Sequence, residues 1–177
     1  MMPNWVQLKR IAAAALMVST LSGCGTEPSR TYLEQGPFES SIDQYAATYV
    51  KQYNILNQSS ASMVRMNRQS DLQTLTPYFR NWRVRFLGAA TDRNGEATVM
   101  FNALNHANVI YETTLSANSS LYPTLSSLKV GEQVEIEGSF IDGDSTDGFK
   151  ELSLTEFGSM TAPEFEIELT GIRRTGP

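Results

Sequence analysis

Apolar and polar residues alternate along several short stretches in the second half of the chain, beginning at Trp82. Side chains that alternate in this way point to opposite faces of a β-strand, so each stretch predicts a strand with one buried and one solvated face. The predicted strands are 82–87, 97–103, 109–115, 134–140 and 149–157, followed by a further run at 165–169. Several half-buried strands at short intervals are typical of a small antiparallel barrel or sandwich.

The segments between these strands carry their own signals. Asn94 and Gly95 favour a two-residue type I′ hairpin turn, because both residue types tolerate positive φ. Gly88 marks a point where the first strand can bend sharply. Leucines at helical spacing over 119–128 predict a short helix, with Pro123 in its first turn. The order is therefore three strands, a helix and two strands, and then a closing or edge strand whose glutamates would discourage edge pairing.

This order of elements resembles the OB-fold, a five-stranded barrel with a helix between its third and fourth strands. The resemblance is most specific in the run LKVGEQVEIEG from Leu128 to Gly138, which is similar to the helix exit and fourth strand of the tRNA_anti-like family of bacterial OB-fold proteins. We therefore expect a mainly β fold with an N-terminal helix and a small antiparallel OB-like barrel over residues 81–177. A different antiparallel barrel or sandwich is the alternative.

Residues 39–80 are predicted to be a helical segment. Ser41 followed by Gln44 has the form of a helix capping box, and apolar residues then recur at helical spacing to about residue 57. These residues are Ile42, Tyr45, Ala46, Tyr49, Tyr53 and Leu56. A stripe of this kind is too apolar to leave in water, so we expect the helix to pack on the barrel. A second short helix within 58–80 is a further expectation, although its apolar residues do not follow one period.

The start of the chain has the three parts of a secretory signal. Lys9 and Arg10 precede an apolar stretch of residues 11–21, which is shorter than the roughly 20 residues that a membrane-spanning helix needs. The run Leu21-Ser22-Gly23-Cys24 then resembles the lipobox of bacterial lipoproteins. This resemblance implies that residues 1–23 are removed by cleavage between Gly23 and Cys24, and that a diacylglyceryl group is attached to the sulfur of Cys24.

Lipidation would decide where the protein resides, because two or more acyl chains anchor a protein stably. Gly25 occupies the position where resembling lipoproteins of enteric bacteria carry an aspartate as an inner-membrane retention signal. We therefore expect attachment to the periplasmic face of the outer membrane, with inner-membrane retention as the alternative. Residues 24–38 contain breakers and few apolar residues, and are interpreted as a flexible tether. Cys24 is the only cysteine, so no disulfide is expected within the domain.

Charge is unevenly distributed along an acidic chain whose formal net charge is -5. Nucleic acid is a poor partner for such a surface. Residues 61–100 hold six arginines against three acids, whereas residues 131–170 hold eleven acids against Lys150 alone. The basic and acidic parts are expected either to face each other or to face two different partners.

The sequence offers few residues for catalysis or for metal binding. His106 is the only histidine and is predicted in a solvated turn, so a histidine-dependent nucleophilic site is not indicated. A zinc site is equally unsupported, because the lipid occupies the one cysteine. Asp142, Asp144 and Asp147 could offer oxygen ligands to calcium, but the turn departs from the EF-hand pattern and an acidic hairpin turn is the simpler interpretation. No cofactor is expected.

OB-folds often bind along the barrel with aromatic and basic side chains, which makes Trp82, Arg83, Arg85 and Tyr111 a candidate binding surface. The alternation also places Trp82 on the core face, and the two arginines can pair with Glu135 and Glu137 on the other face. The leading hypothesis is a non-enzymatic periplasmic lipoprotein that binds an envelope protein or a small ligand. The alternative is a structural subunit of an envelope-spanning secretion or conjugation assembly. A hydrolase of envelope polymers is a third hypothesis, although no spacing singles out a pair of acids.

Overall fold

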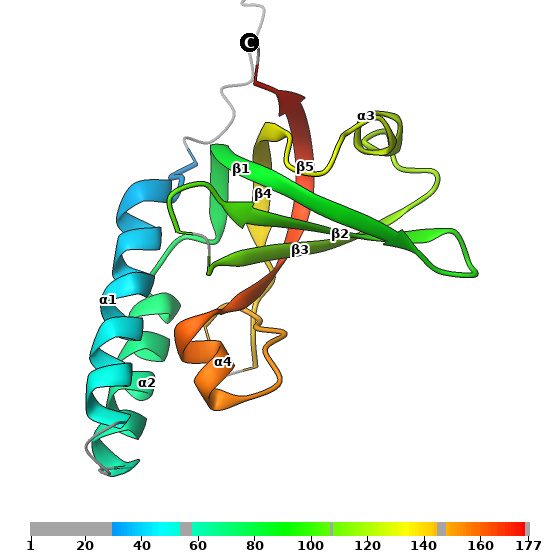
Figure 1. The fold of residues 1–177 in the computed structure, drawn as a ribbon. Helices are drawn as coiled ribbons and strands as arrows, with labels where there is room; N and C mark the ends of the chain where they lie inside the picture. Colours follow the sequence, from blue (N-terminus) through cyan, green and yellow to red (C-terminus); the bar gives the residue numbers. More distant parts are fainter. Residues whose placement is uncertain (1–29, 54–57, 107, 145–147, 176–177) are drawn as a thin grey trace, which may run out of the picture.

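A closed five-stranded barrel forms the centre of the protein in a computed structural model that describes residues 30–53, 58–106, 108–144 and 148–175 (Figure 1). The strands are β1 (Tyr78–Thr91), β2 (Glu96–Ala103), β3 (Ile110–Ser116), β4 (Gln133–Phe140) and β5 (Glu164–Arg174). They pair in the order β1-β2-β3-β5-β4, and β4 closes the barrel on β1. All pairs are antiparallel except β3 with β5. The expected fold is confirmed: mainly β, OB-like, with an N-terminal helix and a short helix, α3 (Tyr122–Ser126), between the third and fourth strands.

The barrel interior is filled with side chains from the alternating positions of the strands. Trp82, Val84 and Phe86 are all buried, as the alternation predicts. Phe140 lies among several other rings and stacks on Phe149 at 4.3 Å between centroids. Because the core is continuous, a ligand would have to bind outside the barrel.

The long strand β1 pairs with β2 and with β4, and its register shifts once against each of them. Its register shifts between Phe86 and Gly88, where the φ of Gly88 is 156°, so an irregularity lies at the glycine where a bend is expected. A second shift lies between Phe79 and Trp82. Here Asn81 has a φ of 58°, a left-handed conformation that asparagine adopts more readily than most residues other than glycine. The bulges increase the local twist and so allow one strand to pair with β2 and β4.

Two antiparallel helices, α1 (Gln35–Tyr53) and α2 (Gln58–Gln73), pack against one side of this barrel (Figure 1). Phe38 and Ile42 of α1 belong to the barrel core, so the expectation that the tyrosine-bearing helix packs on the barrel is confirmed. Farther along α1, Tyr49 joins a second cluster with Ala61 and Val64 of α2. The second helix is also confirmed. None of the described helices is long and apolar enough to cross a membrane.

The beginning of α1 differs from the prediction. The helix starts at Gln35, and Ser41 therefore lies inside it instead of capping it. Gly36 and Pro37 lie in the first turn, where proline is tolerated because the N–H that it lacks would have no helical partner. The tether predicted over 24–38 thus ends earlier, and its Leu33 already pairs with Phe79.

The hairpin turn between β1 and β2 also differs from the prediction. Only Gly95 has a positive φ, 83°, so the turn is not type I′. The Asp92 carboxylate accepts hydrogen bonds from the N–H groups of Asn94 and Glu96, at 2.8 and 2.9 Å. This carboxylate satisfies the turn's backbone donors, and Asn94 need not adopt a left-handed conformation.

The prediction of a strand at 149–157 is wrong. Phe149 and Glu151 form only isolated bridges, and the chain then enters helix α4 (Glu156–Thr161). The hydroxyl of Thr155 accepts from the N–H of Gly158 at 3.0 Å, which is the N-cap contact that starts this helix. The run at 165–169 lies instead in the fifth barrel strand, β5, which pairs on both sides and is not an edge.

Candidate functional site

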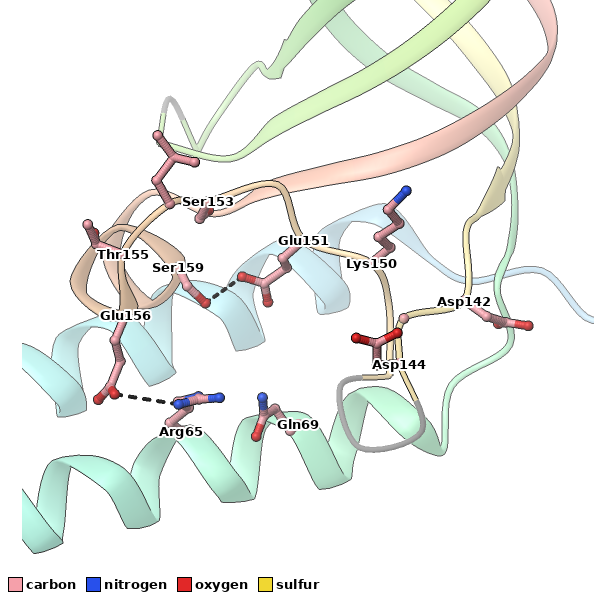
Figure 2. A pocket seen from close by; sticks show the side chains of 12 residues that line it. Arg65, Gln69, Asp142, Asp144, Lys150, Glu151, Ser153, Thr155, Glu156 and Ser159 are labelled. Atoms are coloured by element: carbon pink, nitrogen blue, oxygen red, sulfur yellow. Dashed lines mark hydrogen bonds and ion pairs between the residues drawn. The ribbon is translucent and has the colours of Figure 1, made fainter.

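A cleft lies between α2 and the segment that connects β4 to β5 (Figure 2). This connection packs against the helical hairpin through α4. The hollow has a volume of about 370 Å³ and is called here the α2–α4 cleft. Its lining residues are Arg65, Gln69, Asp142, Gly143, Asp144, Lys150, Glu151, Ser153, Leu154, Thr155, Glu156 and Ser159.

A buried arginine supports one wall of the α2–α4 cleft. Arg68 of α2 is 1% exposed, and its guanidinium donates to the carbonyl and the hydroxyl of Ser159, at 2.7 and 2.9 Å. The same guanidinium pairs with Glu151, whose carboxylate also accepts from the Ser159 hydroxyl. Burial lowers the pKa of Arg68, while the negative charge of Glu151 opposes that shift. The network fixes Glu151 and Ser159 relative to α2.

Some of the charged side chains at the surface of the cleft form ion pairs. Arg65 and Glu156 lie 3.5 Å apart and are both about half exposed. Figure 2 marks this ion pair with a dashed line. Lys150 pairs with Glu166 of β5. Glu156 also accepts from the hydroxyl of Tyr49 at 3.0 Å. Burial, and then this carboxylate, raise the pKa of Tyr49 to about 12. The cleft is therefore polar and acidic, because four carboxylates outnumber two cations among its lining residues.

A second hollow, more aromatic and about 450 Å³ in volume, adjoins the cleft. Its lining residues are Tyr49, Tyr53, Ala61, Ser62, Thr155, Glu156 and Phe157, so the two hollows share Thr155 and Glu156. The rings of Tyr53 and Phe157 are 5.7 Å apart and remain about half exposed. Leu154, which lines the cleft next to Thr155, is fully exposed. We refer to Tyr53, Leu154 and Phe157 as the apolar rim.

Ser159 and Glu151 are in hydrogen-bond contact within the cleft. The hydroxyl of Ser159 donates to Glu151, but that carboxylate is also neutralised by Arg68, which makes it a weak base for activating a hydroxyl. His106 does not line either hollow. Its ring contacts the carboxylate of Asp43 and lies 3.8 Å from that of Glu39, both on α1.

The position of His106 corrects the expectation of a solvated loop residue. Its side chain is 17% exposed, because α1 packs over the loop between β2 and β3. Glu39, itself buried, also accepts from the hydroxyl of Tyr111 at 2.9 Å. Sequence alone did not indicate this cluster, since its members come from segments far apart in the chain.

The candidate surface of Trp82, Arg83, Arg85 and Tyr111 is not one surface. Trp82 and Tyr111 are buried in the core, whereas the two arginines point outward and are exposed. The expected pairing of these arginines with Glu135 and Glu137 is also wrong. Glu135 pairs with Arg173 and Glu137 with Arg80, because bulges and the return of β5 bring other arginines closer.

The expectation that the basic and acidic parts of the chain face each other is confirmed by three ion pairs. Arg65 and Arg68 pair with Glu156 and Glu151, and Arg80 with Glu137. The sequence did carry one signal for the cleft: Arg68 occupies the same helical stripe as the buried residues Ala61, Val64 and Leu72. A buried arginine in such a stripe requires an acidic partner elsewhere in the fold.

Asp142 and Asp144 line the α2–α4 cleft. Asp147, the third candidate calcium ligand, lies outside the described residues, as do Gly23 and Cys24. Within the described ranges, no group of three or more acidic, histidine or cysteine side chains is placed to hold a metal ion.

Comparison of the chain with protein-family models, with curated proteins and with solved structures finds no match.

Proposed function

We propose that the protein is a non-enzymatic lipoprotein, anchored through Cys24 to the periplasmic face of the outer membrane, which binds a segment of another envelope protein. The binding surface is the α2–α4 cleft together with the adjoining aromatic hollow. The single observation that carries this proposal is the apolar rim beside a polar cleft, with Leu154 fully exposed and Phe157 48% exposed. A small protein gains nothing in stability from such side chains in water, and patches of this kind are typical of interaction surfaces.

The chemistry of the two hollows describes the partner. Aromatic side chains with exposed edges, Tyr53 and Phe157, suit an apolar or aromatic anchor residue, which supplies most of the binding energy in many interfaces. The polar cleft beside it suits the backbone and neutral polar groups of the same segment. Acidic ligands are disfavoured, because carboxylates outnumber cations among the residues that line the cleft.

A photo-crosslinking amino acid placed at Leu154 tests this function in native envelopes. Val130 is the matched control, since it is also an apolar residue with high exposure, 75%, but lies in the turn before β4. We expect one envelope protein to be crosslinked at Leu154 and not at Val130. This crosslink should be lost in a Phe157→Asp variant and weakened in a Cys24→Ser variant that leaves the membrane.

Other outcomes of this experiment contradict the proposal in distinct ways. The same crosslinked species at both positions, or none at Leu154, would remove the cleft as a binding surface. A crosslinked second copy of the chain would instead favour the structural-subunit alternative. A Cys24→Ser protein that fractionates with the membrane like the unchanged protein would contradict the lipid anchor.

A further inference from the structure

The first described residues are fixed along the outside of β1. The N–H of Leu33 donates to the carbonyl of Tyr78 at 2.7 Å, and its carbonyl accepts from the indole N–H of Trp82 at 3.0 Å. The hydroxyl of Thr76 donates to the carbonyl of Thr31 at 3.1 Å. These contacts determine which side of the barrel the N-terminal segment leaves from.

Two arginine–tyrosine contacts lie where that segment meets the barrel. The guanidinium of Arg30 lies 4.2 Å from the centre of the Tyr78 ring, and that of Arg80 lies 4.5 Å from the Tyr32 ring. All four residues line a hollow of about 190 Å³ on the barrel surface. We call these four residues the tether face. Tyrosine and arginine combine an apolar body with a polar end, and such side chains favour the headgroup region of a bilayer.

The length of chain before the tether face limits its distance from the lipid. Five residues separate Cys24 from Arg30. A chain of that length spans at most about 20 Å even when fully extended. The tether face is therefore confined close to the headgroups, whatever the conformation of the intervening residues.

The apolar rim of the α2–α4 cleft lies at the other end of the helical hairpin. Helix α1 begins next to the tether face at Gln35 and ends at Tyr53, whose ring contacts Phe157 of α4. Its 19 residues correspond to about 28 Å along the helix axis. Figure 1 shows the start of α1 and helix α4 well separated on the molecule.

We infer that the tether face lies against the lipid headgroups of the membrane and holds the α2–α4 cleft pointing away from it. This inference rests on the proposed function, because it requires the lipid on Cys24. The charges around the tether face are balanced by acids such as Glu137, which pairs with Arg80. The contact with the headgroups therefore comes from the aromatic and arginine side chains more than from any net positive charge.

Fluorescence quenching on vesicles tests this orientation with the lipidated, full-length protein. Because Cys24 is the only cysteine and carries the lipid, one added cysteine can be labelled selectively. Thr170→Cys places the label beside the tether face, where Thr170 is exposed, and Leu154→Cys places it at the cleft. The vesicles contain phosphatidylethanolamine, phosphatidylglycerol and a lipid with a spin-labelled headgroup. We expect several-fold stronger quenching at position 170 than at position 154.

A second comparison tests the side chains of the tether face. In the Thr170→Cys protein, the double change Arg30→Gln with Tyr32→Ser should reduce quenching, whereas Tyr53→Ser, at the far end of α1, should not. Circular dichroism shows whether the barrel in each variant has kept its fold. Unchanged quenching in a folded double variant would overturn the role of these side chains.

The remaining outcomes separate this inference from the proposed function. Equal quenching at both positions in a protein whose mass includes the lipid would overturn the orientation alone. A mass without lipid on Cys24 would overturn the anchor, and the orientation with it.

Discussion

Arg68 of α2 and Glu151 of the β4–β5 connection form an ion pair that joins the helical hairpin to the barrel. The guanidinium is buried, and the carboxylate is mostly buried with it. Removal of one partner from such a pair is costly, because the other charge remains in a medium that solvates it poorly. The pair therefore secures the wall of the α2–α4 cleft.

The change Glu151→Leu should lower the free energy of unfolding by about 3–5 kcal/mol, because it leaves Arg68 without its countercharge. Unfolding in urea measures this change. The matched control is Arg65→Gln, which removes a half-exposed pair and should cost less than about 1 kcal/mol. The double change Arg68→Met with Glu151→Leu should recover most of the loss. Equal effects of Glu151→Leu and Arg65→Gln would contradict the role of the buried pair.

Tyr49 should make the protein less stable at alkaline pH. Its folded-state pKa is about 12, against about 10 in an unfolded chain, so the unfolded state releases this proton first. Its contribution is fully present below about pH 10 and is lost as the pH rises towards 12, at about 1.4 kcal/mol per pH unit. The change Tyr49→Phe should make the pH dependence less steep over this window in urea unfolding. Identical pH dependences of the two proteins would contradict this assignment.

Gly138 should tolerate no side chain. A Cβ atom there would lie 2.1 Å from the backbone oxygen of Glu168 on the neighbouring strand β5. Gly138→Ala should therefore destabilise the protein by about 3 kcal/mol or prevent folding, because overpacking against backbone cannot relax easily. Gly171→Ala is the matched control, since its Cβ would meet only the flexible side chain of Glu137. Thermal unfolding of both variants decides the question, and a harmless Gly138→Ala would refute it.

Tyr111 should stabilise the docking of α1 through its hydroxyl. The hydroxyl donates to the buried carboxylate of Glu39, and burial, followed by the charge of Glu39, raises the pKa of Tyr111 well above its usual value. Tyr111→Phe removes a donor from a buried acceptor and should cost about 1–3 kcal/mol. Tyr53→Phe, whose side chain is half exposed, should cost far less. Equal unfolding midpoints for these two variants would contradict the prediction.

The strands of the barrel were predictable where alternation alone determines which side chain is buried. Trp82, Val84 and Phe86 face the core because a period of two on a half-buried strand has only one favourable register. The region 149–157 was not predictable in this way. Its apolar residues resemble those of a strand, but Thr155 caps a helix and Leu154 is left in solvent.

The candidate site was less predictable than the fold. The sequence makes Trp82 and Tyr111 candidates for a binding surface, with Trp82 alternatively on the core face, and the barrel buries both. The sequence does not indicate Glu151 or Ser159, because no local sequence pattern distinguishes a serine that contacts a buried arginine from a solvated serine. Their role follows only from the packing of α4 on the helical hairpin.

The sequence by itself determined the first four strands with the short helix before the fourth, the absence of a disulfide from the barrel domain, and the expectation of a lipid on Cys24. These properties depend on local patterns: the period of apolar residues, the number of cysteines and the order of residues in a short motif. Only the tertiary structure decided that the last run closes the barrel, that Arg68 pairs with Glu151, and that Tyr53 meets Phe157 beside the cleft. Those relationships join residues far apart in the chain, and burial of the shared core selects them over the alternatives that local patterns permit.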